Sequence, residues 1–411
     1  MMFGMPYLFR GSLVQPLRRP AAVPDRRKSS DGKGAGDRLH ALDFARFIAM
    51  LFMMQGHVLD ALVGTAWIDV SVFPWNIWHA FRGFTAPVFL MVSGAVHAFA
   101  SKRGENGLIR EDVLAKRIRW ALTIIGIGYL LVMPANRIWD LPFVPSQVWA
   151  PALSVNILQL TGVTMLMFVI VMHTTRSVRD MGRRGLLTGL AIVALTPLMQ
   201  YVPPSMLPAW VMSYLNPSTG SLFPIFPFSS FLFFGIAVGA YLHGIPAEHR
   251  NEHIKRYGWR AGGVMAACAT LCYYAALGMG VPDSALASST SVLLVLQRLG
   301  VVLMIFSASV VLLERTWKLR NWYSMFGKKS LYIYVIHLVL LFGTPWFDGI
   351  GRTHFRVFDL ATGLGFVALI MTSTLILAFA MDRFERYPWK PAHRRALSLA
   401  ACLLLGWLLM V

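Results

Sequence analysis

Eleven long apolar stretches constrain this chain more than any other feature of its sequence. Each is long enough, or nearly so, to cross about 30 Å of hydrocarbon as a helix of about 20 residues. Their approximate limits are 41–63, 79–100, 118–134, 152–173, 185–202, 222–243, 260–281, 289–313, 330–347, 359–381 and 396–411. The stretches are continuously apolar rather than alternating, which excludes a closed β-barrel. We therefore predict an all-α polytopic membrane protein of about eleven transmembrane helices.

The composition supports a membrane protein and argues against other classes. Hydrophobic residues make up 56% of the chain and charged residues 14%, whereas soluble domains carry about 25% charged residues. Three cysteines leave no room for a disulfide framework. The net charge of +19 would suggest a nucleic-acid partner in a soluble protein. Here the cations stand in short clusters between apolar runs, so we expect no nucleic-acid partner.

The clusters of Lys and Arg indicate how the chain is oriented. They occupy the N-terminal tail and the loops after the even-numbered stretches, whereas the loops at 64–78, 203–221 and 282–288 contain neither residue. Cationic loops remain in the cytoplasm. We therefore expect a cytoplasmic N-terminus and an external C-terminus, in a multi-pass protein of a bacterial inner membrane. Only the loop with Arg352 and Arg356 departs from this pattern.

The domain organisation follows from the same division of the chain. Residues 1–37 are rich in Pro and Arg and hold no long apolar stretch. We expect them to form a flexible basic cytoplasmic tail that rests on anionic lipid. Residues 38–411 are expected to form a single membrane-embedded domain.

The first apolar stretch carries two ionisable residues on one face. Arg46 and His57 are eleven residues apart, which returns to within about 20° of the same face three turns along a helix. An ionisable side chain within a membrane is costly unless it faces protein or water. This face therefore places a cation near the cytoplasm and an imidazole in the outer half of the membrane.

Other polar residues fall at a similar depth. They are Arg82 in the second stretch, Gln159 in the fourth, Arg298 in the eighth and His337 in the ninth. Periodicity alone does not show that they converge, and a single buried histidine is more often a core residue than a catalyst. Several imidazoles and guanidiniums with few carboxylates nevertheless favour a site for an anionic or carbonyl-bearing ligand.

Small residues in the second stretch have two readings. Pro87, Ser93 and Gly94 permit a kink and a close approach of another backbone. Ordinary helix packing explains them equally well. Elsewhere, His249 and His253 have a spacing that suits a metal, but a solvated loop is the better explanation, and we expect no metal. Walker, dinucleotide and serine-hydrolase motifs are missing from the sequence.

Four segments resemble the transmembrane acyltransferase superfamily, which includes the acyltransferase-3 enzymes, the YeiB-like proteins and heparan-alpha-glucosaminide N-acetyltransferase. The segments are "RLHALDFARFIAMLFMMQGH", "FRGFTAPVFLMVSG", "FPIFPFSSFLFFGIAVG" and "FGKKSLYIYVIHL", with weaker similarity in "NILQLTG" and "LQRLG". Together they span roughly residues 38–340. Phe47 departs from the pattern, because the family often has glycine after its arginine.

The resemblance implies transfer of an acyl group, often acetyl, from cytoplasmic acyl-CoA to an external acceptor. Acetyl-CoA is the expected donor, and the acceptor would be a hydroxyl or amine of a carbohydrate or related small molecule. In that reading His57 is the general base, as suits an imidazole, or is itself acylated first. Arg46 would meet the donor, and Arg82 or Arg298 would steady the acceptor or the oxyanion. Ser93, Gln159 and His337 complete the expected binding residues.

Two other functions compete with the acyltransferase. The first is a transporter that exports a lipid-linked or acylated precursor, which the number of apolar stretches and the polar residues near the membrane centre would suit. Ion-driven carriers usually need membrane carboxylates and inverted repeats, however. Apart from Asp60, the carboxylates sit at the ends of the stretches, and we find no such repeat. The second is an inactive regulator that binds acyl-CoA or sterol. A homodimer is compatible with all three functions.

Overall fold

The computed structural model describes residues 39–99, 101, 103–389 and 391–410, and the basic tail predicted at 1–37 lies outside them. The helices up to residue 219 are α1 (His40–Leu62), α2 (Trp75–Arg82), α3 (Thr85–Phe99), α4 (Glu111–Leu131), η1 (Ile138–Phe143), α5 (Ser146–Leu153), α6 (Ile157–His173), α7 (Val178–Gln200), α8 (Ala209–Leu215) and η2 (Pro217–Thr219). Most of the apolar stretches thus fold as helices.

The rest of the described chain is also helical, apart from one short hairpin. Its elements are α9 (Ile225–His243), η3 (Ala247–His249), α10 (Arg250–Gly278), α11 (Asp283–Leu286), α12 (Val292–Arg315), η4 (Trp317–Leu319), α13 (Arg320–Lys328), α14 (Ser330–Phe342), β1 (Gly343–Thr344), β2 (Phe347–Asp348), α15 (Ile350–Thr353), α16 (Leu360–Arg386) and α17 (Pro391–Met410). Strands β1 and β2 pair antiparallel, with Gly343 opposite Asp348. The predicted all-α class is confirmed.

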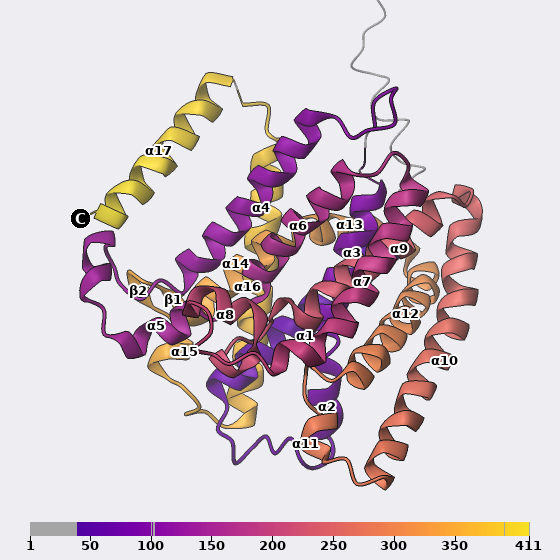
Figure 1. Ribbon diagram of the computed structural model, residues 1–411. Helices are drawn as coiled ribbons and strands as arrows, with labels where there is room; N and C mark the ends of the chain where they lie inside the picture. The colour runs from indigo at the N-terminus through magenta and orange to yellow at the C-terminus, as the bar shows by residue number, and fades with distance from the viewer. Residues whose placement is uncertain (1–38, 100, 102, 390, 411) are drawn as a thin grey trace, which may run out of the picture. The chain divides into compact units, whose positions relative to one another are not determined.

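Helix α1 is the central element of residues 39–410. It packs against α3, α12, α13, α14 and α16, and Figure 1 shows it among these helices with α10 and α17 at the periphery. Its buried side chains belong to three apolar clusters, which contain Leu42, Leu59 and Met54 respectively. A polar residue on α1 is therefore surrounded by protein, which is the setting in which a membrane helix tolerates it.

Two helices approach closely because glycines face each other's backbone. A methyl group built on Gly94 of α3 would overlap the carbonyl oxygen of Leu232 in α9, and one on Gly235 would overlap that of Met91. Membrane helices associate through such small residues, because lipid supplies no hydrophobic force between them. The predicted close approach at Gly94 is thus confirmed. The close contact between α3 and α9 places α3, which carries Ser93, inside the helix bundle.

Several of the described helices are long and apolar enough to cross a membrane. Five of the described helices are individually long and apolar enough to span, and two bent helix pairs bring the total to seven at most. The eleven apolar stretches all coincide with helices, but several of these are short or broken. The predicted polytopic membrane class is thus confirmed, and the number of about eleven crossings stays a prediction.

Two of the predicted apolar stretches are interrupted as helices. The stretch 79–100 divides into α2 and α3, and Pro87 occupies the third position of α3, where a proline removes no helical hydrogen bond. The stretch 330–347 ends as a helix at Phe342, because Gly343 has φ +80° and starts the hairpin. Glycine adopts this conformation without the steric cost that a side chain would impose.

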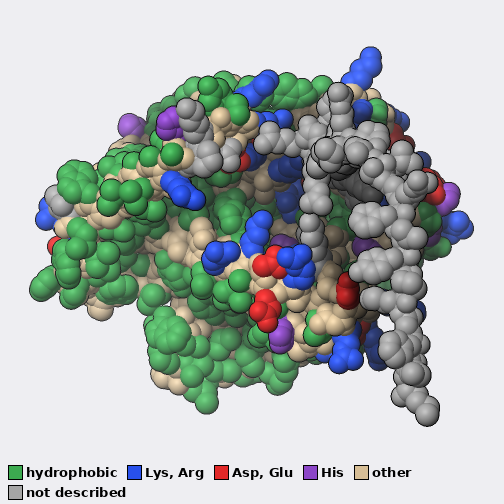
Figure 2. Space-filling view, turned by 90° about the horizontal axis from the view of Figure 1, so that it is seen from above, with side chains coloured by type: hydrophobic (Ala, Val, Ile, Leu, Met, Phe, Trp, Pro, Cys, Tyr) green, Lys and Arg blue, Asp and Glu red, His purple; other side chains and the backbone are tan. Residues whose placement is uncertain are grey.

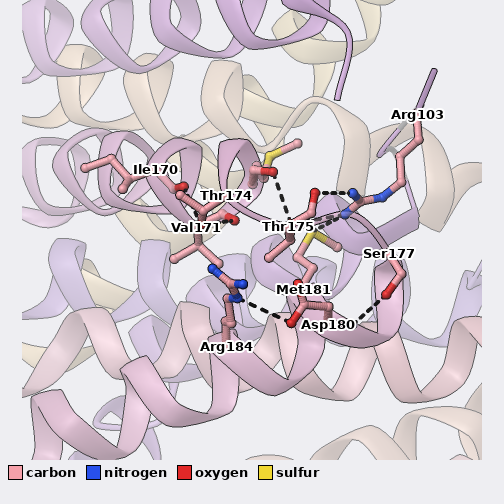
Figure 3. A network of polar contacts seen from close by, with 10 residues as sticks. Arg103, Ile170, Val171, Thr174, Thr175, Ser177, Asp180, Met181 and Arg184 are labelled. Carbon is pink, nitrogen blue, oxygen red and sulfur yellow. Dashed lines mark hydrogen bonds and ion pairs between the residues drawn. The ribbon is translucent and has the colours of Figure 1, made fainter. Parts of the chain in front are cut away.

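The loops that carry most cations meet at one end of the helices, which we call the inner end. There, Nη1 of Arg103 donates to the carbonyl oxygens of Gly107 (2.8 Å) and Thr175 (2.7 Å). Figure 3 shows this guanidinium between the loop after α3 and the loop before α7, close to Asp180. Burial lowers the pKa of the Arg103 guanidinium, and the Asp180 carboxylate partly opposes that shift. The two loops are therefore held together by one side chain.

The opposite end, which we call the outer end, is fastened to the C-terminal end of α1. The amide of Arg356 donates to the carbonyl oxygen of Ala61, and that of Phe358 donates to Leu62, both over 2.9 Å. In Figure 1 this end holds α2, α11 and α15. Asp359 then begins α16 by accepting from the amide of Thr362 at 2.7 Å, a cap that lowers the pKa of its carboxyl.

We expect Gly235→Val to destabilise the protein by about 1–3 kcal/mol, because the added side chain must push α3 away from α9. The measurement is thermal unfolding of detergent-purified protein. Gly263→Val on α10 is the matched control, since nothing lies within 4 Å of a methyl group built there. Equal losses in the two variants would contradict the packing role of Gly235.

Candidate functional site

Two histidines from helices far apart in the sequence meet in the outer half of α1. Nδ1 of His57 on α1 lies 3.0 Å from Nε2 of His337 on α14. The two rings are nearly parallel, with their centroids 5.3 Å apart. His337 is fully buried, whereas His57 is partly exposed. Of the two imidazoles, His57 is therefore the one that a ligand can reach.

A backbone carbonyl determines which nitrogen of each ring carries a proton. Nδ1 of His337 lies 2.9 Å from the carbonyl oxygen of Ile333, and a carbonyl only accepts. In the neutral ring, Nδ1 is therefore the donor and Nε2 is an acceptor. His57 must then donate from Nδ1 to Nε2 of His337, which leaves its own Nε2 with a free lone pair. The arrangement thus leaves Nε2 of a neutral His57 imidazole as a hydrogen-bond acceptor.

A guanidinium next to this pair is held rigidly. Arg82 of α2 forms a two-pronged ion pair with Asp60, in which Nη1 lies 2.8 Å from Oδ1. Its Cζ lies 4.5 Å from the ring centroid of Trp78, whose indole N–H donates to Gln55 at 3.0 Å. The side chain also fills the space beside Gly56, the residue before His57. Asp60 therefore neutralises much of the charge of Arg82.

A second guanidinium approaches the same end of the bundle. Nη1 of Arg298 on α12 lies 3.4 Å from the carbonyl oxygen of Ser289. Its Nη2 lies 3.4 Å from a methyl group built on Gly83, which follows Arg82. Arg298 thus reaches the turn between α2 and α3, next to the residue that follows Arg82. Among the described residues, no carboxylate is within ion-pair distance of Arg298.

A cavity of about 210 Å³ opens toward the inner end of α1. Its polar lining consists of Arg46, Ser93, His97, Thr161, Lys328, Ser330 and Tyr332. Nη2 of Arg46 donates to Oγ of Ser93 at 3.1 Å, and its Cζ lies 5.4 Å from the ring centroid of Phe89. Arg46 and Ser93, both predicted as binding residues, thus lie in contact in one cavity.

Sequence reasoning missed two polar residues beside this cavity. His97 follows Ser93 by one turn of α3, and its Nδ1 forms a hydrogen bond with Nη1 of Arg117 on α4. Arg117 is buried and lies 5.8 Å from the ring centroid of Phe168. Ser93 and His97 are four residues apart, which places them on one face of a helix. This spacing could have identified His97 from the sequence. Arg117 belongs to a cluster of cations after the second apolar stretch, and charge pattern alone gives no sign that it is buried.

Gln159 has a different setting from the other predicted residues. Its side chain is fully buried, and neither amide atom has a hydrogen-bond partner among the described residues. Its Oε1 lies 2.9 Å from a methyl group built on Gly128 of α4. The neighbours Leu158 and Thr161 line the inner cavity, whereas Gln159 does not. The geometry therefore brings Gln159 close to the cavity wall without exposing it.

The inner cavity and the histidine pair share one face of α1. Arg46 and His57 are separated by about 16 Å along the axis, at 1.5 Å per residue, and Met53 stands between them on this face. The cavity extends from Lys328 to Leu158, the second residue of α6. Figure 2, which views the inner end, shows Lys and Arg side chains gathered near the middle of that face with a few Asp and Glu. Positive charge is therefore concentrated at the inner end.

Comparison with known families decides the assignment. A family described as "Heparan-alpha-glucosaminide N-acetyltransferase, catalytic" matches residues 38–276, more than half of the chain. The chain belongs to this family. The membrane acetyltransferase resemblance predicted from the sequence is thereby confirmed. No curated protein matches the chain.

The family match covers only part of the site. Arg46, His57, Arg82, Ser93 and Gln159 lie within residues 38–276. Arg298 and His337 lie beyond it, and so does the hairpin β1–β2. The histidine that orients His57 therefore belongs to the part of the chain outside the family match.

We expect ring nitrogens of His57 and His337 to show the proton positions deduced above. In ¹⁵N NMR of histidine-labelled protein at neutral pH, each of the two rings should have a protonated Nδ1 and a bare Nε2. His337→Phe serves to assign the signals. A protonated Nε2 on His57 in the unsubstituted protein would contradict the deduction.

Proposed function

We propose that the protein transfers an acyl group, acetyl in the first instance, from acyl-CoA to a hydroxyl or amine of a glycan acceptor. The donor phosphates would bind at the inner cavity, and the acceptor would enter from the outer end. The observation that carries the proposal is the bare Nε2 of His57, held on the same helix face as the cationic cavity. Membership of an acetyltransferase family supports the reaction class.

The proposed reaction uses His57 as the general base. Nε2 takes the proton of the acceptor O–H or N–H as that atom attacks the thioester carbonyl. The tetrahedral intermediate then expels the thiolate of CoA, which receives the proton back from the imidazolium of His57. The hydrogen bond to His337 keeps the ring oriented throughout, and such proton transfer typically accelerates a reaction about 10²–10⁴-fold.

Arg82 and Arg298 differ in how many of their N–H groups are available to an oxyanion. Arg82 is already engaged by Asp60 through both of its terminal nitrogens. Arg298 contacts a backbone carbonyl at 3.4 Å and retains donors for a developing negative charge, since a guanidinium has five N–H groups. We therefore assign oxyanion stabilisation to Arg298 and positioning of α2 to Arg82.

The donor would extend along α1. Arg46, Lys328 and Arg117 line or border the inner cavity, and guanidiniums bind phosphates through paired hydrogen bonds. The pantetheine arm would then follow the face of α1 past Met53 toward His57. An acceptor proton and a CoA thioester would thus meet in the outer half of the membrane.

The first test is release of the CoA thiol from acetyl-CoA by protein in lipid nanodiscs, with a glucosamine oligosaccharide as acceptor. We expect His57→Ala to lower kcat at least about 10²-fold. His79→Ala is the matched control, because His79 is an exposed outer-end imidazole on α2. Full activity of His57→Ala would refute the proposal, and oligosaccharide transport without thioester loss would favour the transporter.

The donor assignment has its own test. We expect Arg46→Ala to raise KM for acetyl-CoA about 10- to 100-fold, the value of a hydrogen bond to a charged group. The KM of Arg46→Lys should fall between those of the unsubstituted protein and Arg46→Ala. Arg184→Ala is the control, since Arg184 is an exposed inner-end arginine paired with Asp180 at 3.3 Å. An unchanged KM in Arg46→Ala would remove this arginine from the donor site.

Two substitutions that differ in hydrogen-bonding capacity test the role of His337. We expect His337→Phe to lower kcat about 10²-fold, because Nδ1 of His57 loses its acceptor and the ring is free to turn. His337→Gln offers an amide oxygen to the same N–H and should recover part of the loss. The readout is kcat across pH, with KM for both substrates unchanged. Equal losses for Phe and Gln would argue against orientation of His57.

A further inference from the structure

A second and larger cavity lies at the outer end, away from the donor cavity. It measures about 600 Å³. Its walls come from two parts of the chain about 200 residues apart, the segment from the end of α4 to α5 and the hairpin with α15. The lining residues used below are Asn136, Trp346, Phe347, Asp348 and Arg352. None of these residues takes part in the reaction proposed above.

The aromatic side of this cavity is held in place by backbone groups. The indole N–H of Trp346 donates to the carbonyl oxygens of Asn136 and Leu408, each at 3.0 Å. The two bonds fix the orientation of the indole and join the loop after α4, the hairpin and α17. Phe347 adds a second ring, and this residue is 55% exposed. An exposed aromatic ring at a cavity wall offers an apolar face to a ligand.

The polar side of the cavity has donors and acceptors but little net charge. Nη1 of Arg352 lies 3.3 Å from Oδ1 of Asp348 and 3.4 Å from the carbonyl oxygen of Thr344. Both charged side chains are substantially exposed, at 43% and 64%. The guanidinium donates and the carboxylate accepts, so the pair can engage hydroxyl groups from both directions. Their mutual neutralisation disfavours an anionic lipid headgroup.

The cavity is rigidly connected to the histidine pair. Helix α14 carries His337 and ends at Phe342, so the hairpin begins about 9 Å farther along the helix axis. A methyl group built on Gly351 of α15 would lie 3.0 Å from the carbonyl oxygen of Leu341 and 3.3 Å from Cβ of Ala61. The hairpin segment thus packs on both α14 and α1. Cavity and base are held at a fixed separation.

We propose that this outer cavity binds a sugar ring of an oligosaccharide, one or two units from the ring that reacts. Sugar rings combine an apolar C–H face, which suits Trp346 and Phe347, with hydroxyls that suit the Asp348–Arg352 pair. As an assignment of acceptor binding, this rests on the function proposed above. The cavity would select oligosaccharides over monosaccharides by holding the neighbouring unit.

The test separates binding from catalysis. Saturation-transfer NMR with chitotriose is carried out on His57→Ala protein in nanodiscs, where the reaction is silent. We expect saturable binding, weakened about five- to tenfold by Phe347→Ala, the value of one aromatic contact, and weakened also by Arg352→Ala. Phe143→Ala is the matched control, since Phe143 is 84% exposed and lies outside the cavity lining.

The outcomes decide each proposal independently. Loss of chitotriose binding in Phe347→Ala but not in Phe143→Ala supports the sugar site even where no acyl transfer is detected. In otherwise unsubstituted protein, Phe347→Ala should then raise KM for the trisaccharide and leave KM for glucosamine unchanged. Absence of saturable binding, equal binding by all variants, or displacement of chitotriose by phosphatidylglycerol overturns the sugar site.

Discussion

The hydrogen bond between His57 and His337 is the contact on which the rest of the site depends. It joins the central helix α1 to α14 at 3.0 Å, deep in a bundle where an unsatisfied polar group is costly. Nδ1 of His337 donates to the carbonyl oxygen of Ile333. Its Nε2 can therefore only accept, and Nδ1 of His57 must be the donor. Helix packing alone would hold α14 against α1, but only this chain of hydrogen bonds fixes the identity of the free nitrogen.

The surrounding helices act as supports for this contact. Glycines let α3 approach α9 closely. In this position, Ser93 of α3 contacts Arg46 on the neighbouring α1. At the outer end, Asp60 and Arg82 tie α2 to α1, and the segment before α16 is hydrogen-bonded to Ala61 and Leu62. The inner and outer halves of the site thus share one rigid element, and each half is fastened to it by separate contacts.

Sequence patterns predicted what lies along one helix better than what lies between helices. The common face of Arg46 and His57 follows from helical periodicity, and both residues border the site. The depth of His337 was predicted, but its partner was not, because hydropathy carries no information on how α14 is rotated against α1. For the same reason Gln159 was expected in the site and is instead buried against Gly128. The break between α2 and α3 and the end of α14 before Gly343 were not predicted either, since apolar length hides them.

The single free nitrogen of His57 has a consequence for energy coupling. Nδ1 is occupied by His337, so on the proposed reaction the proton taken from the acceptor and the proton given to the thiolate pass through the same Nε2. CoA then enters the membrane core as a neutral thioester and withdraws as a neutral thiol, with its phosphates remaining at the inner end. No net charge crosses the bilayer. Membrane voltage, which acts with about 2.3 kcal/mol per charge at 100 mV, would neither drive nor oppose turnover.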